Sequence, residues 1–164
     1  MRVYGVTGWK NSGKTHLVER LVAEIAGRGL SVSTVKHAHH ATEIDHPGRD
    51  SYRHREAGAR EVIVASPVRW ALMHELRGGA EPPLAELLAK LSPVDLVLVE
   101  GYKRESHPKI EAHRAVTGRP LLAPDNPSVR AVASDSAHPG LGLPVLDLDD
   151  TGAIAAFILG EVGL

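Results

Sequence analysis

The chain of 164 residues contains no cysteine. This absence excludes disulfide bonds, thiolate zinc sites and cysteine nucleophiles. No apolar run approaches the roughly 20 residues that a membrane-spanning helix needs. The first residues, MRVYGVTG, also lack the apolar core of a signal peptide. We therefore expect a cytoplasmic protein without a membrane segment.

Neither sign of charge is in excess. The sequence has 19 basic and 20 acidic residues, a formal net charge of -1, and no run of like charges. A protein that binds nucleic acid or an anionic membrane surface usually shows a basic patch. We therefore expect neither kind of partner. The length suits one domain with one hydrophobic core, and we expect residues 1–164 to form that single domain.

Short apolar strands alternate with amphipathic helices along the chain. This pattern predicts a three-layer α/β fold, a mostly parallel sheet with helices on both faces. Residues 69–76 and 109–116 are predicted as added strands, some of them antiparallel. The other strands are expected at residues 3–7, 32–37, 62–65, 96–99, 130–133 and 145–148. The helical stripes are Leu17, Val18, Leu21, Val22 and Ile25; Leu84, Leu87, Leu88 and Leu91; and Ile154, Phe157 and Ile158.

The segment GWKNSGKT, residues 8–15, matches the phosphate-loop pattern G-x-x-x-x-G-K-[ST]. It lies between the first predicted strand and the first helical stripe, the position that this motif requires. Its glycines allow backbone N–H groups to converge on phosphate oxygens at a helix N-terminus. Lys14 would reach the β- and γ-phosphates, and the Thr15 hydroxyl would bind magnesium. The alternative is an ordinary glycine turn that caps a helix.

The segment DLVLVEGY offers two carboxylates as a second magnesium ligand, Asp95 before the apolar strand and Glu100 after it. In a parallel sheet the phosphate loop lies at the carboxyl ends of the strands. Five residues at about 3.3 Å each place Asp95 roughly 16 Å from Glu100, at the opposite edge. We therefore expect Glu100 to bind the magnesium or a water beside it. We expect Gly101 to let the backbone approach the γ-phosphate.

The segment SVSTVKHAHH forms the second predicted strand and ends in Lys36, His37, His39 and His40. The carboxyl end of this strand should emerge beside the phosphate loop. Three interpretations of the histidines stay open: a zinc clamp, a solvated cluster without a role, and an edge that faces an anion or substrate. Adjacent residues of a strand point in opposite directions, and no cysteine completes a zinc tetrahedron, so we favour the anion-facing edge.

Five segments in this order resemble the MobB family, the adapter proteins of molybdopterin guanine dinucleotide biosynthesis: GWKNSGKTHL, VKHAHH, DHPGRDSYRHREAGA, DLVLVEGYK and PKIEAHR. The resemblance covers most of the chain. It implies a P-loop protein, usually a homodimer, that binds GTP with magnesium and hydrolyses it slowly. It also implies an association with the guanylyltransferase MobA, which joins GMP to the molybdenum-carrying pterin.

The loop motif and the resemblance together assign the site residues. Catalysis is assigned to Lys14 and Glu100, and magnesium to Thr15 and Glu100. Nucleotide binding is assigned to Gly8, Asn11, Ser12, Gly13, Lys14, Thr15, His16, Lys36, His37, Asp50, Gly101 and Lys103. The resemblance further implies a polar face toward the anionic pterin, for which ordinary surface salt bridges are the alternative: Lys36, His37, Asp50, Arg53, His54, Lys103, Lys109 and Arg114.

Guanine preference rests on the resemblance alone, because the sequence has no N-K-x-D or T-K-x-D motif. Asp125 and Asp135 follow late strands, where a base edge could be read, although Asp125 also suits a turn before Asn126 and Pro127. Two other classes stay open. A small-molecule kinase would use Asp45 or Asp50 as a base, and a GTPase that delivers nickel or zinc would use the histidines.

Overall fold

The computed structural model describes residues 1–38 and 44–164, which form two compact units. The larger unit contains Met1–His37 and Leu88–Leu164, and the smaller contains Ala38–Leu87. His39 and His40, two members of the predicted histidine cluster, lie outside the described residues. That residues 1–164 act as one nucleotide-binding domain stays a prediction.

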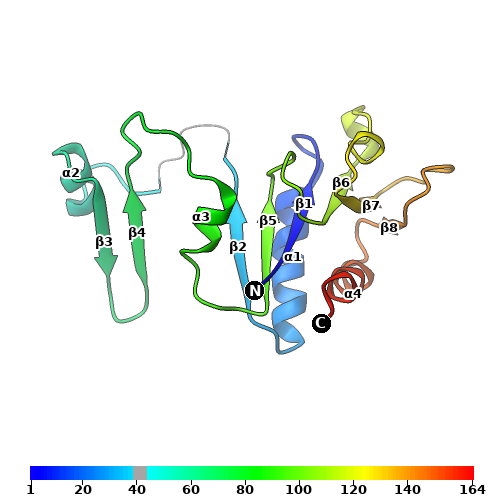
Figure 1. The fold of residues 1–164 in the computed structure, drawn as a ribbon, viewed down its shortest axis with the longest axis horizontal. Helices are drawn as coiled ribbons and strands as arrows, with labels where there is room; N and C mark the ends of the chain where they lie inside the picture. The colour runs from blue at the N-terminus through cyan, green and yellow to red at the C-terminus, as the bar shows by residue number, and fades with distance from the viewer. Residues whose placement is uncertain (39–43) are drawn as a thin grey trace. The chain divides into compact units, whose positions relative to one another are not determined.

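A six-stranded sheet forms the centre of the larger unit, in the order β2-β5-β1-β6-β7-β8 (Figure 1). Every pair of neighbouring strands is parallel. The carboxyl ends of all the strands therefore lie at one edge of the sheet. The strands are β1 (Arg2–Thr7), β2 (Val32–Lys36), β5 (Leu96–Glu100), β6 (Lys109–His113), β7 (Val129–Ser134) and β8 (Val145–Asp147).

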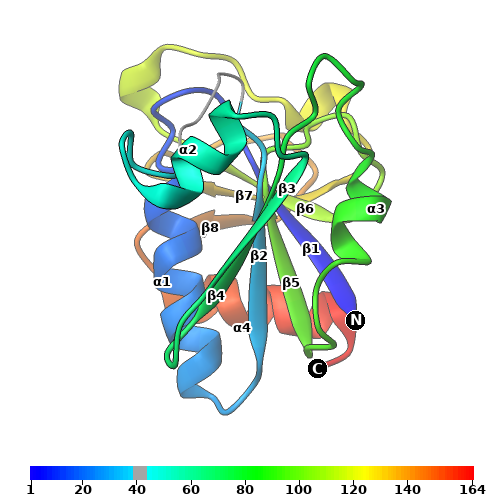
Figure 2. The same cartoon turned by 90° about the vertical axis from the view of Figure 1, so that its left-hand side faces the viewer.

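Two helices, α1 (Lys14–Gly27) and α4 (Thr151–Val162), pack on one face of this sheet and against each other (Figure 2). Their apolar stripes follow the helical period, so one side of each helix is apolar. The apolar side chains of the two helices pack against every second side chain of the strands and form the main core. The core contains Tyr4, Val6, Leu17, Leu21, Ile25, Leu96, Leu98, Ile110, Ala112, Ile154 and Ile158, all almost fully buried.

The opposite face of β6 carries buried polar side chains. Lys109 and Glu111 are fully buried, and His113 is almost so. The Glu111 carboxylate accepts hydrogen bonds from the backbone N–H groups of Leu122 and Ala123, at 2.8 to 2.9 Å. Burial raises the pKa of Glu111, and these hydrogen bonds lower it. Glu111 thus fastens the segment with the short helices η1 (Ala115–Thr117) and η2 (Ala123–Asp125) to the sheet.

The smaller unit contains helix α2 (Asp50–Glu56) and an antiparallel hairpin of β3 (Glu61–Ala65) and β4 (Trp70–His74). The Ser66 side chain stabilises the hairpin turn, since its hydroxyl accepts from the N–H of Arg69 at 3.1 Å. The short helix α3 (Leu84–Leu88) follows. Asp50 is the first residue of α2, and Arg49 is its N-cap.

The predicted α/β fold with a mostly parallel sheet is confirmed, and two strands differ in their place. Residues 62–65 were expected with the other main strands, yet β3 pairs only with β4 in the hairpin among the described residues. Residues 109–116 were expected as a strand added to the main sheet. That expectation is wrong, because β6 lies inside the sheet between β1 and β7. Among the described residues, no helix is long and apolar enough to cross a membrane.

His107 lies close to Gly5 of β1, where an added methyl group would be 2.7 Å from the His107 Nε2 and 2.8 Å from the Lys109 Cβ. Its buried Nε2 has no hydrogen-bond partner among the described residues. Burial and the nearby Lys109 charge lower the pKa of His107 from its ordinary value of 6.5 to about 4. Between these two values the unfolded chain binds a proton that the folded chain excludes, so stability falls as the pH falls through this window.

Replacing His107 with Gln should therefore reduce the acid sensitivity of the fold. We expect the parent to lose more stability between about pH 7 and about pH 5 than His107→Gln, because the amide has no proton to gain. Urea unfolding at both pH values measures this difference. The exposed His54→Gln variant serves as the control and should respond like the parent. Equal losses in His107→Gln and the parent would contradict the assignment.

Candidate phosphate site

The loop of residues 8–15 joins β1 to α1 in the geometry of an anion cradle. Gly8, Asn11 and Gly13 have positive φ values of 143°, 66° and 91°. Left-handed residues of this kind let successive N–H groups face a common centre. Gly13 is the N-cap of α1 and provides no side-chain hydrogen bond. The first N–H groups of the helix are therefore left for a ligand, where the helix dipole favours negative charge.

The Lys14 ammonium is held across this loop. Its Nζ donates to the Trp9 carbonyl oxygen at 2.6 Å. The Trp9 indole N–H donates in turn to the Pro120 carbonyl oxygen at 2.7 Å, and the Lys103 Nζ lies 4.3 Å from the Trp9 ring centre. Burial lowers the pKa of Lys14, and the positive charges of Lys103 and Lys36 lower it further, against an opposing effect of Glu100. Several cations thus converge at the loop.

Thr15, Glu100 and Lys36 make one connected cluster. The Thr15 hydroxyl donates to Glu100 Oε1 at 2.8 Å. The Lys36 Nζ lies 3.3 Å from the same carboxylate oxygen and 3.3 Å from Thr15 Oγ1. Two hard oxygen donors, Thr15 Oγ1 and Glu100 Oε1, therefore stand side by side at the first turn of α1. This pair fits magnesium, which takes one or two protein oxygens and completes its shell with phosphates and water.

Glu100, and not Asp95, lies at the edge of the sheet that holds the loop. Register explains this, because Val6 of β1 and Lys36 of β2 both pair with Glu100. Asp95 precedes β5, and its Oδ2 accepts hydrogen bonds from the Ser31 hydroxyl and N–H at 2.6 and 2.8 Å. These hydrogen bonds lower the pKa of Asp95. Asp95 therefore fastens the start of β2, as the spacing argument predicts for the far edge.

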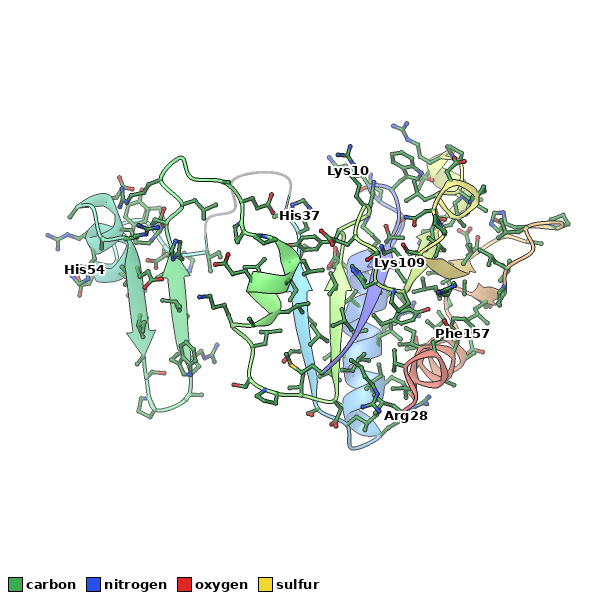
Figure 3. All side chains as sticks on the ribbon, in the orientation of Figure 1. Lys10, Arg28, His37, His54, Lys109 and Phe157 are labelled. Carbon is green, nitrogen blue, oxygen red and sulfur yellow. The ribbon has the colours of Figure 1, made fainter. Side chains whose placement is uncertain are left out.

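His37 and Gly101 continue the same edge. The His37 N–H donates to the Glu100 carbonyl oxygen at 2.9 Å, and the His37 and Tyr102 rings lie 4.7 Å apart. Gly101 has a φ of 94°, and a methyl group there would lie 3.0 Å from the His37 Cβ. Figure 3 shows His37 at the same edge of the sheet as Lys10 of the loop. Glycine at position 101 thus lets the two strand ends approach.

Arg114 follows β6 and reaches the loop from the other side. Its Nε lies 3.1 Å from the position that a Cβ of Gly13 would take. The guanidinium pairs with Asp135 and Asp149 at 3.9 and 3.7 Å. Asp135 Oδ1 also accepts from the Ala115 N–H at 2.8 Å, so part of this carboxylate is engaged in holding η1. A hollow of about 610 Å³ lies beside it, at the ends of β7 and β8.

The remaining predicted residues divide into three groups. His16 is highly exposed on α1 and lies 3.9 Å from Glu19. Asp50, Arg53 and His54 belong to α2 in the smaller unit, where Asp50 and Arg53 form an exposed pair at 3.9 Å. The expectation of Lys109 on an exposed polar face is wrong, because it is fully buried and its ammonium donates to the Glu105 carbonyl oxygen (Figure 3).

Three residues of this region were missed in the sequence. Trp9 supplies the carbonyl for Lys14 and the ring beneath Lys103. Arg119 lies 5.7 Å from the same ring, and Glu111 fastens the segment that carries Arg119. Position 9 is a variable position of the loop motif, so the pattern gave no signal for it. Polar and apolar residues alternate in KIEAH, which indicated that β6 has one polar face. The alternation did not indicate that a later segment of the chain buries this face.

Comparison with known proteins identifies a consistent set of relatives. The sequence profile of the family described as "Molybdopterin guanine dinucleotide synthesis protein B" matches residues 3–135. A molybdopterin-guanine dinucleotide biosynthesis adapter protein of Haemophilus influenzae is 41% identical over 158 residues, 94% of this chain and 85% of that protein. The adapter protein of the same description from Escherichia coli is 40% identical over 154 residues, 92% of this chain and 87% of that protein.

Solved structures agree with these sequences. The crystal structure of a MobB protein homolog from Bacillus stearothermophilus superposes with a TM-score of 0.72 at 30% identity. The match covers 99% of each chain. The parallel sheet, its flanking helices and the hairpin are therefore features that this chain shares with a protein of known structure.

Glycine at position 8 is required by the geometry of the loop. A methyl group there would lie 2.4 Å from the Ala112 carbonyl oxygen and 2.6 Å from Ser12 Oγ, at a φ of 143°. Gly8→Ala should therefore destabilise the fold by about 2 kcal/mol or more. Chemical unfolding measures this loss. Gly160→Ala in α4 is the control, since among the described residues its new methyl meets no atom within 4 Å, and it should be neutral or stabilising.

Proposed function

The chain belongs to the MobB family of molybdopterin-guanine dinucleotide biosynthesis adapter proteins, and from this premise we propose that it is a GTP-binding adapter with at most slow GTPase activity. In this proposal it assists the guanylyltransferase MobA in converting the molybdopterin cofactor to molybdopterin guanine dinucleotide. The single observation that supports nucleotide binding most strongly is the convergence of three lysines on the loop of residues 8–15, where Lys14 and Lys103 contact Trp9 and Lys36 contacts Thr15.

Burial lowers the pKa of Lys14, and the positive charges of Lys103 and Lys36 lower it further. Glu100 offsets only part of the positive charge. A ligand with several negative charges, such as a triphosphate, would neutralise the excess and accept hydrogen bonds from the loop N–H groups. Catalysis of hydrolysis would depend on Lys14 for the developing phosphate charge and on Glu100 for the metal or water.

Thr15 and Glu100 would hold the magnesium, as their adjacent oxygens suggest. When bound, magnesium supplies positive charge that bridges the terminal phosphates. The protein's own contribution is to hold the two oxygens in place. The parallel register fixes Glu100 beside β1, and the first turn of α1 fixes Thr15.

The kinase alternative is less well supported by the carboxylates that it needs. A hydrogen bond from Ser51 and the nearby Arg55 lower the pKa of Asp45, which makes this carboxylate a weaker base. Asp50 is highly exposed and pairs with Arg53. The guanine preference and the partner MobA come from the family. The pterin would meet the exposed Lys36 and the half-buried Lys103 and Arg114 near the loop, but not the buried Lys109.

The decisive measurement is the affinity for GTP and ATP, each with and without magnesium. Lys14→Ala should reduce GTP affinity by at least about tenfold, because it removes the ammonium nearest the terminal phosphates. The fold should persist, as circular dichroism would show. Lys90→Ala is a matched control at an exposed position. A Lys14→Ala affinity within twofold of the parent, or equal affinity for GTP and ATP, would each contradict part of the proposal.

We also propose a homodimer in which the β3–β4 hairpin makes the contact. An isolated two-stranded ribbon is marginally stable, and its edges need covering. The pairs Ile63–Leu72 and Ala65–Trp70 share one face of the hairpin, where Ile63 and Trp70 are 65% and 68% exposed. An apolar face of this kind is more typical of an interface than of a free surface.

Light scattering at micromolar concentration should give the mass of two chains for the parent. Ile63→Glu and Trp70→Glu should shift it toward one chain, because a carboxylate would be buried in the contact. Val116→Glu is the control, since Val116 is also exposed but lies in the larger unit. A monomeric parent would overturn the dimer, and a dimer that survives both hairpin substitutions would place the contact elsewhere.

A further inference from the structure

Lys36 contacts both of the oxygens that fit magnesium. Its Nζ lies 3.3 Å from Glu100 Oε1 and 3.3 Å from Thr15 Oγ1. An ammonium group and a magnesium ion both seek oxygen ligands of negative charge. The Lys36 ammonium therefore has the same two protein partners that the metal would have.

The fold fixes this arrangement through the backbone. Lys36 is the last residue of β2 and pairs in parallel register with Glu100, the last residue of β5. The hydrogen bond from the His37 N–H to the Glu100 carbonyl oxygen, 2.9 Å long, extends this pairing past the strand end. Glu100 is 11% exposed at its side chain, so its carboxylate has little freedom to turn away. The contact is thus a consequence of strand pairing rather than of a mobile loop.

The Lys36 ammonium and a divalent ion cannot both bind Thr15 Oγ1 and Glu100 Oε1 without repelling each other. Like charges at contact distance repel, and the double charge of magnesium doubles the repulsion that a single charge would cause. Binding of magnesium must therefore move the Lys36 ammonium away from Glu100. The Lys36 side chain is 55% exposed, so this ion pair is weak enough to be broken.

We propose that Lys36 is a tethered cation that occupies the place of magnesium at Thr15 and Glu100, so that nucleotide binding depends only weakly on divalent metal. The inference rests on the proposed binding of GTP to this site. With Lys36 present, magnesium exchanges one positive charge for two. Without Lys36, no lysine ammonium of the described residues lies between Thr15 and Glu100, and magnesium adds two positive charges there. Magnesium should then increase the affinity for GTP by a larger factor.

The other lysines do not have this geometry. Lys14 donates to the Trp9 carbonyl oxygen, and the Lys103 ammonium lies over the Trp9 ring. Their loss should weaken phosphate binding to the same extent with and without metal. Only Lys36, of these three, contacts Thr15 Oγ1 and Glu100 Oε1 in the hydrogen bonds and ion pairs of the described residues. Lys103 is therefore a matched control.

The test is the affinity for a fluorescent GTP analogue in excess magnesium and in EDTA. For the parent, the two dissociation constants should differ by no more than about threefold. In Lys36→Met the affinity in EDTA should fall by about tenfold, and magnesium should restore most of it. Lys36→Arg should resemble the parent, because it keeps the charge. Lys103→Met should lower both affinities by the same factor.

A second measurement is the magnesium concentration that half-saturates the GTP-bound protein. It should fall in Lys36→Met, because the metal no longer displaces an ammonium. A rise would show that Lys36 assists the metal and would overturn the inference. An unchanged ratio of affinities in Lys36→Met would overturn it as well. If the parent binds no GTP analogue in either condition, the proposed function fails, and this inference fails with it.

Discussion

The parallel pairing of β5 with β1 on one side and β2 on the other is the constraint on which the candidate site depends. All residues of β5 are buried, so a slip of one residue would exchange its Leu and Val side chains between two packed faces and move the Glu100 carboxylate to the opposite face. The fixed register brings three strand ends together. β1 leads into the phosphate loop, β2 ends in Lys36, and β5 ends in Glu100. The apolar core thereby determines the distances between charged groups at the edge.

Buried polar groups on the opposite face of β6 provide a second support. Glu111 receives backbone hydrogen bonds from Leu122 and Ala123, and Lys109 donates to the Glu105 carbonyl oxygen. These contacts satisfy charges that would be costly if left unpaired in the interior. They also hold the two segments that contact Trp9. One carries Lys103 and the other carries Arg119 and Pro120. The interior of the sheet and the phosphate loop are therefore linked through backbone segments.

The sequence predicted those features that follow from local pattern. The loop motif located residues 8–15, and the length of β5 placed Glu100 at the loop edge and Asp95 opposite, as the structure has them. It did not predict the place of β6, because charged residues at alternate positions suggest an exposed strand. Glu111 is buried because a segment more than ten residues later in the chain covers it, and Lys109 is buried with its ammonium on the Glu105 carbonyl oxygen. Such long-range covering leaves no periodic signal in the strand itself.

The cluster of cations also explains why binding and local structure should be coupled at this edge. Lys14, Lys36 and Lys103 come from three different segments, the first turn of α1, the end of β2 and the residues after β5. Burial is the main cause that lowers the pKa of Lys14, and the positive charges of Lys103 and Lys36 lower it further. A polyanion that binds between them removes this repulsion and attracts all three segments at once. By linkage, whatever fixes these segments together also favours the anion. Tyr102 and Lys103 follow Gly101 directly, and they contact the rings of His37 and Trp9, so the segment after β5 is tied both to the end of β2 and to the loop of residues 8–15.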